Sequence, residues 1–115
     1  MKKVFILGGA GFIGYNLAKF LAKHKNYKIT IGDNFVRGQM DSYLSLLVEK
    51  YNITIIKGDY TDPTIFNKLE DDYDYFYMLA SVVGVNTTLT IPHEIIRINT
   101  ALIINSLEYL KKSKV

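Results

Sequence analysis

The stretch GGAGFIG, residues 8–14, places four glycines within seven residues. It follows an apolar run typical of a buried strand, Lys3–Leu7, and opens a segment with helical periodicity that extends from Phe12 to about Lys25. Glycine costs conformational entropy, but it permits a tight turn and lets another group approach the main chain closely. A strand, a glycine turn and a helix in this order are the context in which a helix N-terminus holds the phosphates of a dinucleotide.

Two glycine spacings overlap in this stretch. Gly9, Gly11 and Gly14 give GxGxxG, and Gly8, Gly11 and Gly14 give GxxGxxG. We expect the early glycines to form the turn, Gly11 to admit a pyrophosphate, and Gly14 to let the helix pack on the strand. Asp33 follows the next strand-like segment. Counted from Gly14, it stands near the separation of roughly 20 residues at which such folds carry the acid that binds the adenosine ribose. The two signals together predict a dinucleotide site.

The rest of the chain alternates strand-like and helix-like segments. Strands are expected at Lys28–Ile31, Ile53–Ile56 and Tyr73–Leu79, and helices at Met40–Lys50, Pro63–Leu69 and about Pro92–Lys112. The face of the last helix is expected to consist of Ile95, Ile98, Leu102, Leu107 and Leu110. This alternation predicts a doubly wound α/β fold, with parallel strands in the order 3-2-1-4 and helices on both faces.

Composition fits a single domain over residues 1–115, with 49% hydrophobic and 22% charged residues. The absence of cysteine excludes disulfides and thiolate chemistry and suits a cytoplasmic protein. Glycines interrupt the first apolar run, so neither a signal peptide nor a membrane span is expected. The net charge of +3 does not favour nucleic-acid binding, because the basic residues form no known nucleic-acid-binding module. His24 and His93 lack metal-ligand spacing, so no metal site is expected.

Further motifs accompany the glycines: DN at 33–34, GD at 58–59, LAS at 79–81 and NTALIINSLE at 99–108. Together they resemble the extended short-chain dehydrogenase/reductase family, the NAD-dependent epimerases and dehydratases of nucleotide sugars. The matches extend over nearly the whole chain, and the resemblance implies NAD as the cofactor. The residues that it implies to bind the cofactor are Gly8, Gly11, Phe12, Ile13, Gly14, Asp33, Asn34, Asp59, Tyr60, Leu79, Ala80, Ser81 and Asn99.

The resemblance also implies a role for each group of residues. The backbone amides of residues 12–13 would cover the pyrophosphate, residues 33–34 would hold the ribose, and residues 59–60 would border the adenine. Residues 79–81 would line the cleft where the fourth strand ends. The loop 82–90, together with Asn99, resembles part of a substrate-facing wall.

Three residues depart from the family pattern. Met78 stands where the family often has His, Ser81 replaces an Ala, and Leu102 replaces a helix Gly. The first two are mild changes for cofactor binding, whereas Leu102 bears on how closely the last helix packs.

Two charged residues bear on the choice of cofactor. A carboxylate at Asp33 would repel the additional phosphate of NADP, which favours NAD. Arg37 is the competing signal, because a guanidinium can pair with that phosphate. Since Asp33 ends a strand and Arg37 lies in a looser segment, we expect NAD.

Family members use a Tyr general base with a Lys four residues later. The one YxxxK match is Tyr15–Lys19 in the first helix, which we interpret as a chance pair of helix neighbours. No catalytic residue is therefore expected, and the chain resembles the N-terminal cofactor-binding portion of a longer enzyme, ending before a fifth strand. The alternative is a non-catalytic NAD- or nucleotide-binding regulatory module.

Expected partners are a nucleotide sugar in the complete enzyme and either a second copy or the missing C-terminal part. The outer edge of the strand Tyr73–Leu79 is expected to be open, and an open strand edge can pair with another chain. The apolar face of the last helix offers a second surface for association.

Overall fold

The computed structural model describes residues 1–24, 26–36, 40–82 and 89–115. Arg37 and residues 83–88 of the loop 82–90 lie outside the described residues. The elements in chain order are β1 (Lys2–Leu7), α1 (Phe12–Ala22), β2 (Tyr27–Asp33), α2 (Ser42–Tyr51), β3 (Thr54–Lys57), the 3-10 helix η1 (Pro63–Lys68), β4 (Tyr75–Met78) and α4 (Pro92–Lys112).

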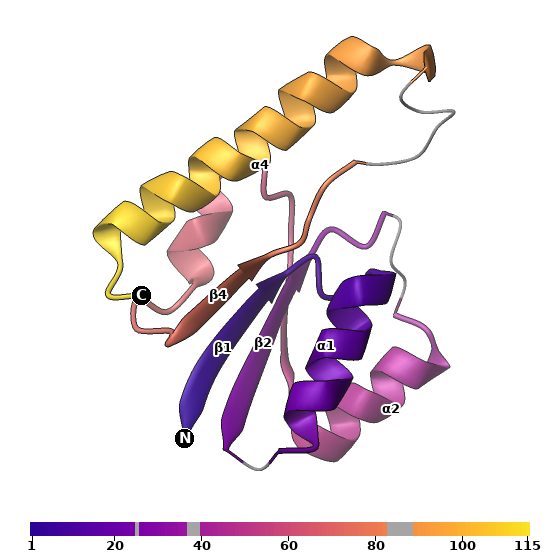
Figure 1. Cartoon of the computed structure of the whole chain (residues 1–115), viewed down its shortest axis with the longest axis vertical. Coiled ribbons are helices and arrows are strands. Elements are labelled where there is room, and N and C mark those ends of the chain that lie inside the picture. Colours follow the sequence, from indigo (N-terminus) through magenta and orange to yellow (C-terminus); the bar gives the residue numbers. More distant parts are fainter. Residues whose placement is uncertain (25, 37–39, 83–88) are drawn as a thin grey trace.

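The four strands form one parallel sheet in the order β3-β2-β1-β4 (Figure 1). This confirms the predicted doubly wound arrangement. At the carboxyl end of the sheet, Leu7 pairs with Gly32 on one side and with Met78 on the other. The strand order reverses between β1 and β4, and such a switch point is where open α/β sheets bind ligands.

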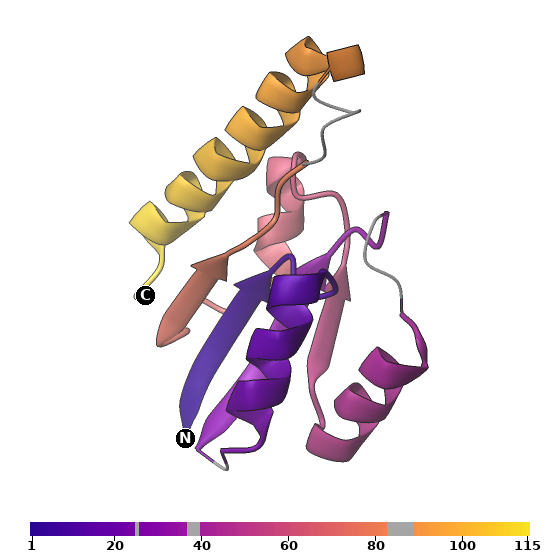
Figure 2. The same cartoon turned by 45° about the vertical axis from the view of Figure 1, so that its right-hand side comes forward.

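Helices cover both faces of the sheet, with α1 and α2 on one face and η1 and α4 on the other (Figures 1 and 2). Side chains of the central strand alternate between these two layers, as they must in a strand. Val4 and Ile6 belong to the core with α1 and α2, whereas Phe5 and Leu7 belong to the core beneath α4. All four are fully buried, so β1 is the centre of the molecule.

Several boundaries differ slightly from the predicted ones, and side-chain caps explain two of them. α2 begins at Ser42 because the Asp41 carboxylate accepts a hydrogen bond from the amide of Leu44 at 2.8 Å. It ends before Asn52, which adopts a left-handed conformation with φ of 54°. β4 begins only at Tyr75, because the carboxylate of Asp74 accepts the Lys3 amide at 2.7 Å.

The prediction that Leu107 belongs to the packed face of α4 is wrong. Leu107 is 58% exposed, whereas Ser106 is only 3% exposed and lies against the sheet side of the helix. Leu102 is buried as expected, and Ile98 packs partly against the same core. At 3.6 residues per turn, the position that follows Leu102 on the same face is residue 106, so Leu107 is rotated toward solvent.

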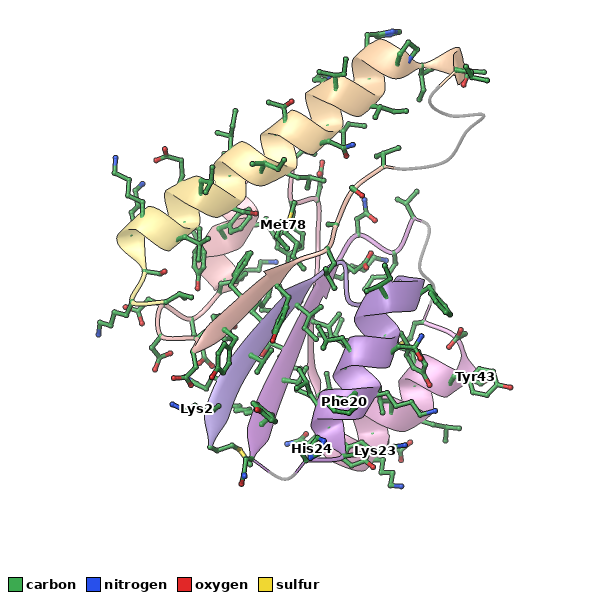
Figure 3. All side chains as sticks on the ribbon, viewed as in Figure 1. Lys2, Phe20, Lys23, His24, Tyr43 and Met78 are labelled. Carbon is green, nitrogen blue, oxygen red and sulfur yellow. The ribbon has the colours of Figure 1, made fainter. Side chains whose placement is uncertain are left out.

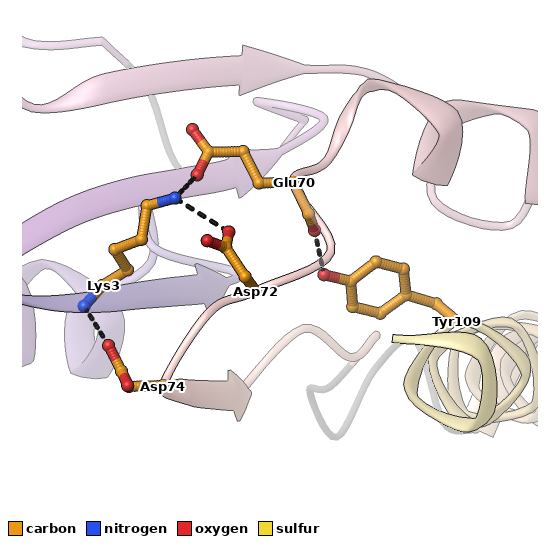
Figure 4. Close-up of polar contacts among 5 residues, drawn as sticks. All are labelled: Lys3, Glu70, Asp72, Asp74 and Tyr109. Carbon is orange, nitrogen blue, oxygen red and sulfur yellow. Dashed lines mark hydrogen bonds and ion pairs between the residues drawn. The ribbon is translucent and has the colours of Figure 1, made fainter. Parts of the chain in front are cut away.

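An ion-pair cluster joins the start of β1 to the segment before β4 (Figure 4). The Lys3 ammonium contacts the carboxylates of Glu70 and Asp72, the latter at 2.8 Å. These hydrogen bonds raise the pKa of Lys3, and the Lys3 hydrogen bond lowers the pKa of Asp72. The Tyr109 hydroxyl donates to the backbone carbonyl of Glu70, so the end of α4 is tied to the same segment.

We expect Lys3→Met to lower the free energy of unfolding at pH 7 and to lower it less under acid conditions. Because the pKa of Asp72 is lower in the folded chain, its stabilising contribution is present above the ordinary value of 3.8 and is lost as the pH falls through the folded-state pKa. Urea unfolding at pH 7 and at about pH 3 measures the difference. Lys2→Met is the control, since Lys2 lies 3.8 Å from Asp74 in a more exposed pair. Equal losses for the two variants would contradict the assignment.

Candidate functional site

A cleft of about 1080 Å³ lies at the carboxyl edge of the sheet. Its walls come from the ends of β1 and β2, from the segments that follow β3 and β4, and from α1, α2 and α4. The predicted residues that line it are Gly8, Gly11, Phe12, Ile13, Gly14, Asp33, Asn34, Asp59, Tyr60, Leu79, Ala80 and Ser81. Of the predicted set, only Asn99 is not part of this lining. The sheet therefore brings together segments that are distant in the sequence.

Two of the glycines are required by the fold itself. Gly8 has φ of 89°, and a Cβ atom there would lie 2.7 Å from the backbone nitrogen of Ala80. The Gly8 amide donates to the carbonyl of Gly32 at 2.7 Å. A Cβ atom at Gly14 would lie 2.6 Å from the Cα of Gly9. These contacts hold the ends of β1, β2 and β4 and the start of α1 in close backbone contact.

Gly11 differs from these glycines because its surroundings are open. A Cβ atom there would meet only the carbonyl oxygen of Gly8, at 3.4 Å, which is an ordinary contact. Gly11 is also the N-cap of α1, and no side chain caps this helix end. The positive end of the helix dipole therefore faces the cleft without a protein side chain to satisfy it. Phe12 and Ile13 follow on the first turn, and both are exposed.

Asp33 is held in place by two backbone amides. Its Oδ2 accepts from Ala10 at 3.0 Å, and its Oδ1 accepts from Phe35 at 2.9 Å. The first bond joins the end of β2 to the glycine turn. Each carboxylate oxygen can accept a second hydrogen bond, so the side chain is oriented without being saturated. The neighbouring Asn34 is exposed and accepts from the amide of Val36 at 3.0 Å.

The segment that follows β3 presents one free carboxylate oxygen. Asp59 Oδ1 accepts from the amide of Thr61 at 2.9 Å and from its hydroxyl at 2.6 Å. Asp59 Oδ2 accepts no hydrogen bond from any residue that the structure describes. Tyr60 is buried, which raises its pKa, and its hydroxyl donates to the carbonyl of Ile56 at 2.8 Å. Tyr60 therefore shapes the wall of the cleft, and Asp59 supplies its polar group.

Two asparagines of α4 hold the segments that line this cleft. Asn99 accepts from the amide of Val82 at 2.7 Å and donates to its carbonyl at 3.2 Å. Asn105 donates to the carbonyls of Tyr60 and Thr61 at 3.1 and 2.9 Å. The sequence prediction missed Asn105. A polar residue close to the buried face of the helix is the signal that could have found it, because such a group needs partners.

Helices α1 and α2 contribute further cleft residues that sequence reasoning missed. Tyr15 and Lys19, interpreted only as helix neighbours, both line the cleft, together with Asp41 and Tyr43. Figure 3 shows Tyr43 pointing outward from the start of α2. Among the described lining residues, Lys19 is the only cation.

Two of the departures from the family pattern, Met78 and Leu102, lie between α4 and the sheet, whereas the third, Ser81, lines the cleft. Met78 packs partly buried against the core beneath α4, and the Ser106 hydroxyl lies 3.9 Å from its sulfur (Figure 3). Leu102 is buried in the same core. The larger side chain at Leu102 is therefore accommodated between α4 and the sheet.

Neither a metal site nor a membrane-spanning helix is found in the ranges that the structure describes. In these ranges no three His, Cys, Asp or Glu side chains gather as a metal site would require. None of the helices there combines the length and apolar character of a bilayer span.

The chain is similar in sequence to one family of known proteins. The model of the NAD dependent epimerase/dehydratase family matches residues 4–115. The UDP-N-acetyl-alpha-D-glucosaminuronate decarboxylase of Bacillus cytotoxicus is 37% identical over 98 residues, 85% of this chain and 29% of that protein. The CDP-paratose 2-epimerase of Salmonella typhi is 30% identical over 112 residues, 96% of this chain and 33% of that protein.

Solved structures agree with these relatives. WbmF of Bordetella bronchiseptica, determined in complex with NAD+, superposes with a TM-score of 0.83 at 27% identity, covering 98% of this chain and 33% of that one. The UDP-Glc/GlcNAc 4-epimerase of Campylobacter jejuni shares the fold with a TM-score of 0.86 at 24% identity, and the match covers 98% of this chain and 34% of that one. The chain thus spans about a third of the length of the proteins it matches. Its sequence and its fold agree that the chain belongs to the NAD dependent epimerase/dehydratase family.

Proposed function

We propose that this chain is the NAD-binding portion of a nucleotide-sugar epimerase, dehydratase or decarboxylase. The observation that carries the proposal is the open, uncapped N-terminus of α1 at Gly11, in the same cleft as the carboxylates of Asp33 and Asp59. The relatives named above act on nucleotide sugars according to their names, and WbmF was determined with NAD+.

Each part of the cofactor has a proposed place in the cleft. The pyrophosphate takes the place that Gly11 leaves open, where the amides of the first turn and the helix dipole favour an anion. Asp33 would accept hydrogen bonds from the ribose hydroxyls with its remaining lone pairs, and Asp59 Oδ2 would accept one from the amino group of adenine. Because a 2′-phosphate would approach the Asp33 carboxylate, NAD is favoured over NADP.

Within this proposal the chain binds and orients the cofactor. Bound NAD supplies a nicotinamide that accepts and returns a hydride. Val82, held by Asn99, lies beyond β4, on the side of the sheet away from Asp33 and Asp59. A dinucleotide that crosses the switch point therefore extends from the β3 side toward this segment.

We expect the isolated chain to bind NAD with a dissociation constant of about 0.1 to 1 mM and to bind NADP more weakly. Calorimetric titration with both cofactors provides the measurement. Equal or tighter binding of NADP would contradict the role given to Asp33.

Gly11→Val should weaken NAD binding by at least about tenfold, because the valine side chain would occupy the space proposed for the pyrophosphate. Thr100→Val, on an exposed part of α4 outside the cleft, is the control and should bind as the unchanged chain does.

The chain alone should not turn over UDP- or GDP-sugars. Tyr15 and Lys19 line the cleft from α1, the helix that carries the phosphate end of the proposed site. A general base must reach the proton that it removes, and we place the sugar at the opposite end of the cofactor. Assays with NAD and nucleotide sugars should give no product for the unchanged chain or for Tyr15→Phe. Turnover that Tyr15→Phe abolishes would overturn this interpretation.

We further propose that α4 pairs with the α4 of a second copy. The apolar residues exposed on this helix are Ile96, Ile103, Ile104 and Leu107; of the residues first expected to be available there, only Leu107 is among them. Three of them, at positions 96, 103 and 107, repeat at the spacing of one helix face. An antiparallel pair centred on Ile103 lays this exposed face of one copy against the same face of the other.

Sedimentation at micromolar concentration should show a dimer, and Ile103→Glu should shift it toward monomer, because a charge cannot be buried without a partner. Leu46→Glu replaces an exposed leucine of α2 and is the matched control. A dimer that persists in Ile103→Glu would instead implicate the outer edge of β4, and a monomer in the unchanged chain would refute the pairing.

A further inference from the structure

We propose that Asn105 is a positioning residue for recognition of the adenine base. Its amide holds residues 60–61 so that Asp59 presents one free carboxylate oxygen to the cleft. This inference rests on the proposed function, because it takes the ligand to be an adenine nucleotide. The geometry that carries it is a continuous series of hydrogen bonds from α4 to that carboxylate.

The series begins on the helix. Asn105 Nδ2 donates to the carbonyls of Tyr60 and Thr61, at 3.1 and 2.9 Å, which uses both of its hydrogens. Asn105 is 44 residues beyond Thr61 in the chain, so this is a tertiary contact and not a local turn. The side chain is partly buried between α4 and the segment that it holds.

The series continues through Thr61 to the carboxylate. The Thr61 amide and hydroxyl both donate to Oδ1 of Asp59, at 2.9 and 2.6 Å. One oxygen is thereby occupied, and the carboxylate plane is fixed. Oδ2 receives no hydrogen bond from a residue in the described ranges, and Asp59 lines the cleft. The position of Thr61, which Asn105 sets, therefore determines where the free acceptor lies.

A fixed carboxylate oxygen can distinguish purine bases. It accepts a hydrogen bond from the 6-amino group of adenine, whereas hypoxanthine carries a carbonyl oxygen at that position. Two acceptors facing each other are unfavourable, and a site built around a donor on the ligand discriminates against analogues that lack it. If the segment were loose, the carboxylate could turn away and the discrimination would fall.

Asn99 provides an internal control on the same helix. Its amide also holds backbone of the cleft region, but at Val82, which follows β4. In the sheet β2 and β1 separate β3 from β4, so the two asparagines hold segments at opposite sides of the site. Replacement of Asn99 should disturb the β4 side and leave base discrimination unchanged.

The test compares ADP with inosine diphosphate by calorimetric titration of the unchanged chain, Asn105→Leu, Asn105→Asp and Asn99→Leu. The unchanged chain should prefer ADP by about tenfold, as expected for one hydrogen bond gained and one repulsion avoided. In Asn105→Leu the preference should fall below about twofold, because the donors are gone. Asn105→Asp keeps the size and removes the donors, and it carries the test if the leucine variant does not fold. Asn99→Leu should retain the full preference.

The outcomes separate the two proposals. If the unchanged chain binds neither ADP nor NAD, the proposed function fails, and with it the basis of this inference. If the unchanged chain prefers ADP and both Asn105 variants keep that preference, Asn105 has only a structural role and the inference is wrong. Equal binding of the two nucleotides by the unchanged chain, or loss of preference in Asn99→Leu, also overturns it.

Discussion

The close backbone contact around Gly8 is the constraint on which the rest of the molecule depends. At this residue the chain leaves β1, donates a hydrogen bond from its amide to the carbonyl of Gly32 in β2, and lies against the backbone of Ala80 beyond β4. No side chain fits between these segments. The same turn brings Gly14 onto Gly9 and so sets the start of α1. A single steric requirement thereby gathers three strand ends and one helix end at one edge, and the cleft is the space that they enclose.

The second organising element is α4, which makes polar contacts with other segments along much of its length. Asn99 and Asn105 hold cleft segments at the carboxyl edge of the sheet, and Tyr109 bonds to Glu70 near the opposite edge. Parallel sheets need helices on both faces, and this helix meets that need while also fixing the loops. Two asparagines of α4 therefore hold loops, one face of the helix packs on the sheet, and another face leaves apolar side chains exposed.

Much of the fold could be predicted from the sequence because its signals are local. Strand and helix periodicity, the glycine turn and the capping residue of η1, Asp62, all act within a few residues. Among the cleft residues, the glycines and Asp33 followed from their spacing, whereas residues 59–60 and 79–81 were implied by the family resemblance. Asn105 and Lys19 were missed, because their roles depend on which distant segment each helix faces. Leu107 was assigned to the wrong side for the same reason: several rotations of an apolar helix look alike until its packing partner is known.

The pairing of β1 has a consequence for how the chain can fold during synthesis. β1 precedes the other described elements in the chain, yet it lies in the centre of the sheet, and Val4 pairs with Tyr75 in β4. The β1–α1–β2 unit can form early, but one edge and one face of β1 stay uncovered until β4 and the layer beneath α4 arrive. Contacts between residues so distant in sequence are slow to form, and exposed apolar strands favour aggregation in the interval. Completion of the sheet, and with it the cleft, must therefore be a late event.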